Sequence, residues 1–167
     1  LSRAHYRVRF PAHFQLIAAM NPCPCGWLGS RRPCRCSVEQ IARYRNRVSG
    51  PILDRIDLQV EVPAIDPVSL IQPSQETTGV EQEHALNKIK QARQFKAERL
   101  QEIPKFNASE HIDTAAKQFL LQAAQQLHFS ARAIQKLIHV GRTIADLDHA
   151  IIINRVHLEE ALMLRQS

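Results

Sequence analysis

Two Cys-x-Cys pairs on one short segment constrain this chain more than any other feature of its sequence. The pairs are Cys23 with Cys25 and Cys34 with Cys36. Glycine and proline residues between the pairs allow a tight loop. A loop of this length has no core of its own, and four thiolates brought together can bind one tetrahedral zinc ion. The sequence therefore predicts a structural Zn²⁺ site at these four cysteines.

The sequence leaves other states of these cysteines open. They are an iron–sulfur cluster and reduced, unliganded or disulfide-bonded cysteines. A redox role is disfavoured because no Cys-x-x-Cys pair is present. The sequence has no run of about 18 apolar residues, and its first residues lack the apolar stretch of a signal peptide. We therefore expect a cytoplasmic protein without a membrane partner, in which clustered thiols stay reduced and bind metal.

The basic charge is concentrated in the first third of the chain. Residues 1–57 hold ten arginines, no lysine and three acids, whereas the rest holds twelve basic and thirteen acidic residues. The planar guanidinium fork of arginine binds phosphate oxygens and carboxylates through paired hydrogen bonds. This distribution favours a polyanion or nucleotide partner, and a solvated basic surface is the alternative.

The first third also contains strand patterns. Phe14–Met20 is a short continuous apolar run, which predicts a strand covered on both faces. Asn21 follows it, at the edge where open α/β sheets place their ligands, although an asparagine can also simply begin a turn. Ser37 opens a capping-box pattern that predicts a helix. Asp57–Val62 alternates apolar and polar residues, as a half-buried strand does.

The second half of the chain is predicted to be helical. Residues 63–79 are rich in Pro, Gln, Ser and Thr, which is typical of a linker. Apolar residues then repeat at helical spacing, and Asp113, Ser130 and Asn154 are placed to cap three of four successive helices. Gly141 lies inside one of these helices and predicts close packing. The expected fold is an α/β fragment followed by an all-α bundle.

Several separated motifs, taken in order, resemble one protein family. They are FQLIAAMNPCPCG, a second Cys-x-Cys pair, RYRNRVSGPILDRIDLQVEVP and SARAIQKLIHVGRTIADL. Together they cover nearly the whole chain and resemble the C-terminal half of the magnesium-chelatase-like AAA+ ATPases, in particular the ComM (YifB-like) subgroup of bacteria. The resemblance implies that residues 1–62 are the C-terminal part of an αβα core, with two strands, the zinc-type loop and a helix. It also implies that residues 80–167 are the helical lid.

The resemblance implies roles for three residues. Asn21 matches the sensor 1 asparagine, which positions the water that attacks the γ-phosphate. Arg55 matches the arginine finger, which is presented to the ATP of a neighbouring subunit, and Arg132 matches the sensor 2 arginine of the lid. These roles are chemically coherent because phosphoryl transfer is catalysed by positioning and by charge stabilisation. The alternatives are an ion pair between Arg55 and Asp54 or Asp57, and a surface position for Arg132.

The resemblance also implies a function for a longer protein. ComM-type proteins are similar to hexameric helicases that use ATP and Mg²⁺ to drive branch migration of DNA during natural transformation. Other subunits and DNA would then be the partners, with Arg3, Arg7 and Arg9 placed to contact nucleic acid. The chain contains no G-x-x-x-x-G-K-[ST] loop and does not begin with methionine. We therefore expect it to be part of a longer protein and not to hydrolyse ATP alone.

A second function from another class remains open. The chain can be read as a non-catalytic, zinc-containing module whose basic first third binds nucleic acid and whose helical bundle binds protein. Insertion of magnesium into a porphyrin is disfavoured, because neither the zinc-type loop nor the basic excess calls for it.

Overall fold

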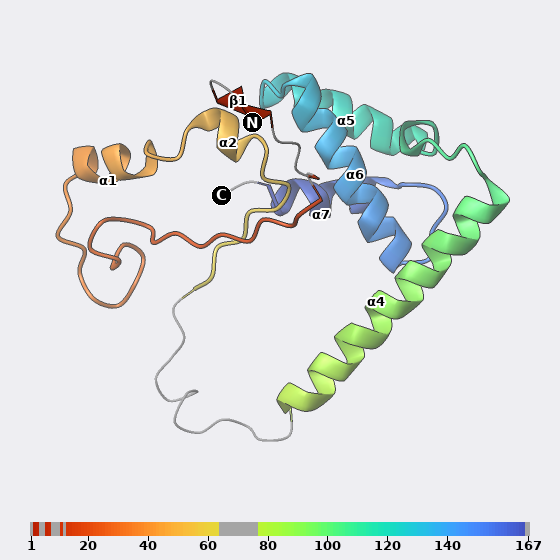
Figure 1. Ribbon diagram of the computed structural model, residues 1–167, viewed down its shortest axis with the longest axis horizontal. Helices are drawn as coiled ribbons and strands as arrows, with labels where there is room; N and C mark the ends of the chain where they lie inside the picture. Colours follow the sequence, from red (N-terminus) through yellow and green to blue (C-terminus); the bar gives the residue numbers. More distant parts are fainter. Residues whose placement is uncertain (1, 4–5, 8–10, 12, 64–76, 166–167) are drawn as a thin grey trace. The chain divides into compact units, whose positions relative to one another are not determined.

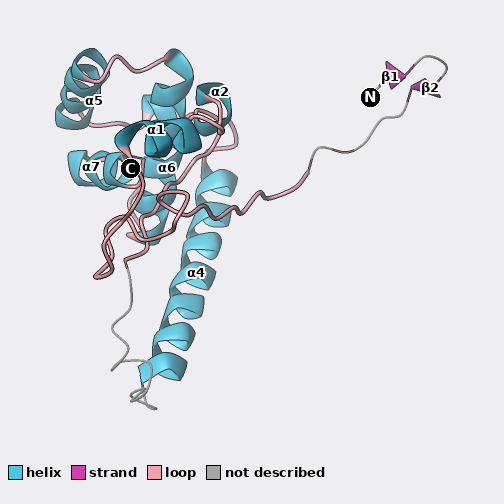
Figure 2. Cartoon of the chain, turned by 90° about the vertical axis from the view of Figure 1, so that its left-hand side faces the viewer, coloured by secondary structure: helices cyan, strands magenta, loops and turns pink. Residues whose placement is uncertain are grey.

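The computed structural model describes residues 2–3, 6–7, 11, 13–63 and 77–165. The chain divides into two compact units, residues 1–47 and 48–167. The first unit contains β1 (Ser2–Arg3), β2 (Tyr6–Arg7) and α1 (Val38–Arg45). The second contains α2 (Gly50–Leu53), α4 (Thr77–Glu102), the 3-10 helix η1 (Ala108–Glu110), α5 (Thr114–Gln126), α6 (Ala131–Leu147) and α7 (Arg155–Met163). Figure 2 labels both strands and the α-helices, and Figure 1 labels all of these except β2.

The first unit consists mainly of loops. β1 and β2 pair antiparallel over two residues each. The predicted capping box at the start of α1 is confirmed: Ser37 Oγ accepts from the Gln40 N–H at 3.3 Å, and Gln40 Oε1 accepts from the Ser37 N–H at 3.0 Å. Residues 13–37, which include the cysteines, form turns and irregular structure.

The two predicted longer strands are not formed. Residues 14–20 and 57–62 adopt no helix or strand. Phe14 is 78% exposed and Ile17 84% exposed, so the expectation that this run is covered on both faces is wrong for this structure. A strand is stable only when neighbouring strands satisfy its backbone N–H and C=O groups, and within the described residues no strand pairs with either segment. The α/β half of the expected fold is therefore not shown.

The second unit contains the predicted helical bundle. Asp113, Ser130 and Asn154 cap α5, α6 and α7, each side chain accepting from the N–H three residues later. Such caps satisfy backbone donors that the first helical turn leaves free. In the part of the chain that the structure describes, no helix is long and apolar enough to cross a membrane.

The core of the bundle lies where α5, α6 and α7 meet. Ile153 and Leu158 are almost completely buried there. A Cβ on Gly141 would lie 2.8 Å from Leu158 Cδ2, which is closer than packed carbon atoms approach. The predicted close packing at Gly141 is therefore confirmed. This packing holds α6 firmly, and the N-terminus of α6 carries Ser130 and Arg132.

Buried charges join α4 to α6. Arg99 of α4 donates to both carboxylate oxygens of Asp146, at 3.2 and 3.0 Å, and Arg142 Nη2 lies 3.1 Å from the same carboxylate. All three side chains are less than 10% exposed. The Arg99 guanidinium also lies 3.9 Å from the centre of the Phe106 ring. Burial lowers the pKa of Arg142, and the Asp146 carboxylate opposes that effect.

Candidate functional site

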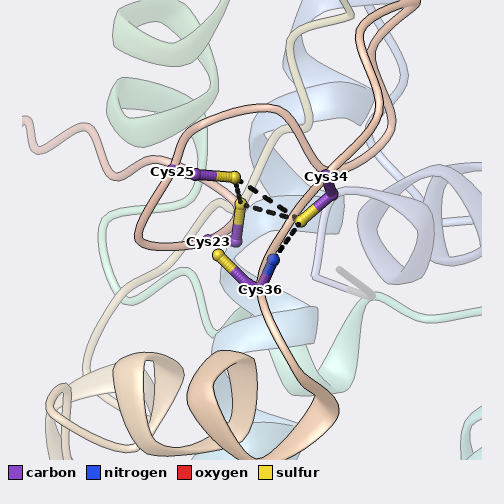
Figure 3. Close-up of side chains that lie close together, drawn as sticks. All are labelled: Cys23, Cys25, Cys34 and Cys36. Atoms are coloured by element: carbon purple, nitrogen blue, oxygen red, sulfur yellow. Dashed lines mark hydrogen bonds between the residues drawn. The ribbon is translucent and has the colours of Figure 1, made fainter.

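The four cysteines lie together in the first unit (Figure 3). The Sγ atom of Cys23 lies 3.4 Å from that of Cys25 and 3.7 Å from that of Cys34, and the Cys25 and Cys34 sulfurs are 3.5 Å apart. All four sulfurs lie within 4.8 Å of one another. A zinc ion with Zn–S bonds of about 2.3 Å spaces its sulfurs about 3.8 Å apart, whereas bonded sulfurs are about 2.05 Å apart. The four cysteines therefore could hold a metal such as zinc, and none is disulfide-bonded.

Local backbone geometry forms this cluster. Gly26 and Gly29 both have φ of +79°, a left-handed conformation that glycine adopts without strain. The Gly26 N–H donates to the Cys23 carbonyl at 3.0 Å and closes the first turn. The Cys36 N–H donates to Cys34 Sγ at 3.5 Å. Backbone N–H groups directed at sulfur stabilise a thiolate or a metal-bound sulfur.

The cysteines are not electrostatically equivalent. Hydrogen bonds from the backbone of Trp27 and of Arg35 lower the pKa of Cys25 to about 6. The Cys36 N–H favours the thiolate of Cys34, but desolvation and the neighbouring sulfurs outweigh it and raise the pKa of Cys34 to about 12. The pKa of Cys36 is also raised: its hydrogen bond with the Cys25 backbone favours the thiolate, but desolvation and the Cys25 and Cys23 sulfurs outweigh it. Desolvation acts against the thiolate of Cys23, but backbone hydrogen bonds from Leu28 and Gly26 help to outweigh it and its pKa is lowered. The pKa is thus lowered at Cys23 and Cys25 and raised at Cys34 and Cys36.

Zinc binding at pH 7 is therefore expected to release protons. Zinc binds thiolates, so Cys34 and Cys36 must lose their protons on binding, and the affinity should fall as the pH falls. Calorimetric titration with zinc in two buffers of different ionisation enthalpy measures the number released. A Cys34→Ser variant serves as the comparison and should release fewer protons. Equal heats in the two buffers would contradict the prediction.

A shallow arginine-lined cavity of about 660 Å³, widely open to solvent, lies in the second unit. Residues 50–59 form one side of it and the N-terminal end of α6 the other. Arg55 and Arg132 both line it, although they are far apart in the sequence. Ser130, the N-cap of α6, lines the same cavity, and its Oγ accepts from the Ala133 N–H at 3.1 Å. A helix N-terminus with two arginines nearby favours an anion.

The segment carrying Arg55 is fixed to the bundle by specific contacts. Lys136 of α6 donates to the Arg55 carbonyl and forms an ion pair with Asp57 at 2.7 Å. Arg55 Nη1 donates to the Pro51 carbonyl at 2.7 Å. Asp54 instead pairs with Arg165 at 2.9 Å. Each of the two acids considered as partners for Arg55 is thus paired with another cation.

Arg132 is free to meet a ligand. Its side chain is exposed at the N-terminus of α6. It makes no hydrogen bond or ion pair with another residue in the described ranges. Its position agrees with the surface alternative and also with a sensor role, because a ligand-binding arginine must have unoccupied donors.

Asn21 lies in the first unit, beside the cysteine loop. Its side chain is exposed, and its Nδ2 would lie 3.9 Å from a Cβ placed on Gly26. The sensor 1 role of Asn21 stays a prediction. The predicted nucleic-acid contacts of Arg3, Arg7 and Arg9 also stay predictions, because these side chains lie outside the described residues.

Sequence reasoning missed two cations at the arginine-lined cavity. Lys136 holds the Arg55 segment, and Arg165 lines the cavity itself. The sequence could have identified Lys136, because it follows Ser130 and Arg132 at a spacing that places all three near the start of α6. Arg165 gave no local signal, because its partner Asp54 is 111 positions away.

Comparisons with known proteins settle the family. The family described as "Magnesium chelatase, subunit ChlI" matches residues 1–70, and "Magnesium chelatase, subunit ChlI C-terminal" matches residues 80–165. The chain belongs to the magnesium-chelatase-like family. It is 39% identical over 170 residues to the uncharacterized protein YifB of Escherichia coli, and 40% identical over 175 residues to the competence protein ComM of Haemophilus influenzae. Both alignments include 99% of this chain.

The magnesium-chelatase-like relatives are longer than this chain. The chain spans 33% of the length of YifB and of ComM. An uncharacterized protein of Mycobacterium bovis is 45% identical over 53 residues, or 32% of this chain and 10% of that protein. The resemblance drawn from the sequence motifs is therefore confirmed at the level of the family.

Proposed function

We propose that this chain is the sensor, arginine-finger and lid portion of a ring-forming, ATP-driven DNA motor. In this proposal residues 1–62 complete an αβα nucleotide-binding core, residues 63–79 are a linker, and residues 80–167 form the lid. Asn21 positions the attacking water, and Arg55 and Arg132 contact nucleotide phosphates. A cytoplasmic hexamer with ATP, Mg²⁺ and DNA as ligands is the expected state of the longer protein.

The observation that carries the proposal is the position of Arg55 and Arg132 in one cavity. Two guanidinium groups and a helix N-terminus around one space suit a polyphosphate. The family motifs predict nucleotide roles for the same two arginines without any information about the cavity. Because both line one cavity, we propose that both act on the same nucleotide. If Arg55 reaches the nucleotide of a neighbouring subunit, Arg132 then reaches it too.

The catalytic roles follow from charge. During transfer of a phosphoryl group, negative charge spreads over the phosphate oxygens and the leaving group. Arg55 would stabilise this charge by donating its remaining N–H groups, while Pro51 and Lys136 hold the residue in position. Arg132 would supply a second positive charge from the start of α6. Mg²⁺, when bound with ATP, would neutralise the β- and γ-phosphate oxygens.

The cysteine cluster has a structural role in this proposal. Zn²⁺ bound by Cys23, Cys25, Cys34 and Cys36 would fix a loop that lacks a core of its own. The same loop carries Asn21 next to Gly26. Zinc would therefore fix the segment that presents the sensor 1 residue, without taking part in phosphoryl transfer.

The proposal is tested with the longer protein, extended upstream of Leu1. ATP turnover is measured with no DNA, with linear duplex and with branched DNA. The motor proposal expects turnover that rises with DNA, most with the branched substrate. If the longer protein binds branched DNA but neither binds nor hydrolyses ATP, the non-catalytic zinc-containing module is the better description.

A further inference from the structure

Arg165 is a third arginine at the same cavity. It follows α7, and its side chain is only 10% exposed. Its Nη2 donates to Asp54 Oδ1 at 2.9 Å, whereas its Nη1 is buried and has no hydrogen-bond partner among the described residues. Buried donors are nearly always paired, because leaving one unpaired costs free energy. Arg99 and Arg142 also have one buried nitrogen without such a partner, but of the three arginines Arg165 is the one that lines the cavity, where a ligand could supply an acceptor.

The charge of the cavity points to the same kind of ligand. Among the described lining residues Asp54 is the one acid, and Arg55, Arg132 and Arg165 are cations. Asp54 also accepts a long hydrogen bond of 3.5 Å from Ser130, the N-cap of α6. Its carboxylate thus lies between Arg165 and the start of a helix of 17 residues. That is a favourable position for any anion.

We propose that Arg165 binds phosphate in this cavity and that Asp54 is its counter-ion until a di- or triphosphate displaces it. The inference rests on the function proposed above for the same cavity. It adds Arg165 to the phosphate-binding residues and a competition between Asp54 and the phosphate for Arg165. A phosphate group offers more acceptor oxygens and more negative charge than a carboxylate. It can therefore take the place of Asp54 on Arg165, and Arg132 lines the same cavity as a second cation.

The test measures binding of inorganic tripolyphosphate to the 167-residue chain by calorimetry at low salt. Arg165→Gln is expected to weaken binding about tenfold, as the loss of a charge-assisted contact does. Asp54→Asn is expected to tighten binding several-fold, because it removes the competing carboxylate. Arg155→Gln and Glu159→Gln serve as matched controls, since they make the corresponding changes, arginine to glutamine and carboxylate to amide, at an exposed ion pair of α7. Both controls should bind like the unchanged chain.

The opposite signs of the two variants distinguish binding from structure. If the Asp54–Arg165 pair only stabilises the fold, both variants weaken binding or neither changes it, and the inference is overturned. Circular dichroism of each variant shows whether it is folded, and Arg165→Lys, which keeps the charge, should lose part of the affinity. If Arg132→Gln weakens binding while Arg165→Gln does not, Arg165 is structural and the proposed function stands.

The source of the phosphate is a separate arm of the same test. A single-stranded oligothymidylate is titrated under identical conditions. If the chain binds the oligonucleotide through Arg165 but does not bind tripolyphosphate, the cavity receives a nucleic-acid backbone and the inference is overturned. If tripolyphosphate competes with ATP for the longer protein and Arg165→Gln weakens both, the site is part of the nucleotide site.

Discussion

Mixed rings of Arg55→Ala and Arg132→Ala subunits are expected to hydrolyse ATP no faster than rings of either variant alone. Each substitution in the longer protein should lower turnover about 10³-fold, because an arginine finger contributes at least that much to phosphoryl transfer. Both arginines line one cavity of one chain, so both should be delivered to the same nucleotide. Every subunit in the mixture then supplies Arg55 and Arg132 with one of the two replaced by alanine. No interface therefore regains activity.

The opposite arrangement gives a different result. If Arg132 acted on the nucleotide of its own subunit and Arg55 on that of its neighbour, some interfaces would contain both arginines. In a random equal mixture about a quarter of the head-to-tail interfaces would be intact. Turnover would then recover to about a quarter of that of unmodified rings, and the shared-cavity interpretation would fall.

Two controls make the mixing experiment decisive. ATP binding by each variant, measured with a fluorescent analogue, should be retained, so that the loss lies in turnover. Subunits with a disabled upstream phosphate-binding loop are also mixed with Arg55→Ala subunits. Recovery in that mixture shows that Arg55 acts across an interface. If ATP turnover recovers neither in this mixture nor in the mixture of Arg55→Ala with Arg132→Ala subunits, both arginines act within their own subunit.

Local sequence rules identified most of the bundle. A capping side chain satisfies the helix N–H three residues later within a few residues of sequence, so Ser37, Asp113, Ser130 and Asn154 could be recognised without knowing the fold. The cysteine cluster was predictable for the same reason, because all four cysteines lie on one loop.

The two strand predictions were wrong because a strand is stabilised by residues that are distant in the sequence. Apolar runs such as Phe14–Met20 specify a strand only when other strands satisfy their backbone groups. In the described residues the Gln59 N–H instead donates to the Leu164 carbonyl at 2.7 Å. The sequence could likewise not predict that Arg55 and Arg132 line one cavity, because this depends on how residues 50–59 contact the bundle. The family motifs identified the two arginines but gave no distance between them.

The buried arginines were missed for a third reason. Sequence reading assigns arginine to the surface, since it is almost never fully buried unless paired. A weak signal existed: Arg99 lies seven positions after Ala92, on the same helical face, and both are buried. Arg142 and Asp146 are four positions apart in α6, which allows an ion pair on one face. The partner that joins them, on α4, could not be read from the sequence.

Asp146→Ala is expected to destabilise the bundle by about 3–5 kcal/mol, the cost of breaking a buried ion pair. The carboxylate faces two guanidinium groups, Arg99 and Arg142, and both are buried. Removing it leaves two positive charges in a poorly solvated space, where they also repel each other. Arg142 keeps its hydrogen bonds to the carbonyls of Ala150 and Ile151. Among the described residues, the contact left to the Arg99 guanidinium is the one with the Phe106 ring.

Urea unfolding of the chain, followed by circular dichroism at 222 nm, measures this loss. Glu159→Ala is the matched control, because it breaks an exposed ion pair with Arg155 and should cost only about 0.3–0.5 kcal/mol. The Asp146→Ala chain could lose its helical signal even without urea. That outcome would be the largest destabilisation the prediction allows. If instead the two variants unfold at the same urea concentration, the buried cluster does not hold α4 to α6. The same cluster bears on the proposed function, because α6 and its N-cap carry Ser130, Arg132 and Lys136. A weakened attachment of α6 should therefore also lower the affinity of the cavity for tripolyphosphate.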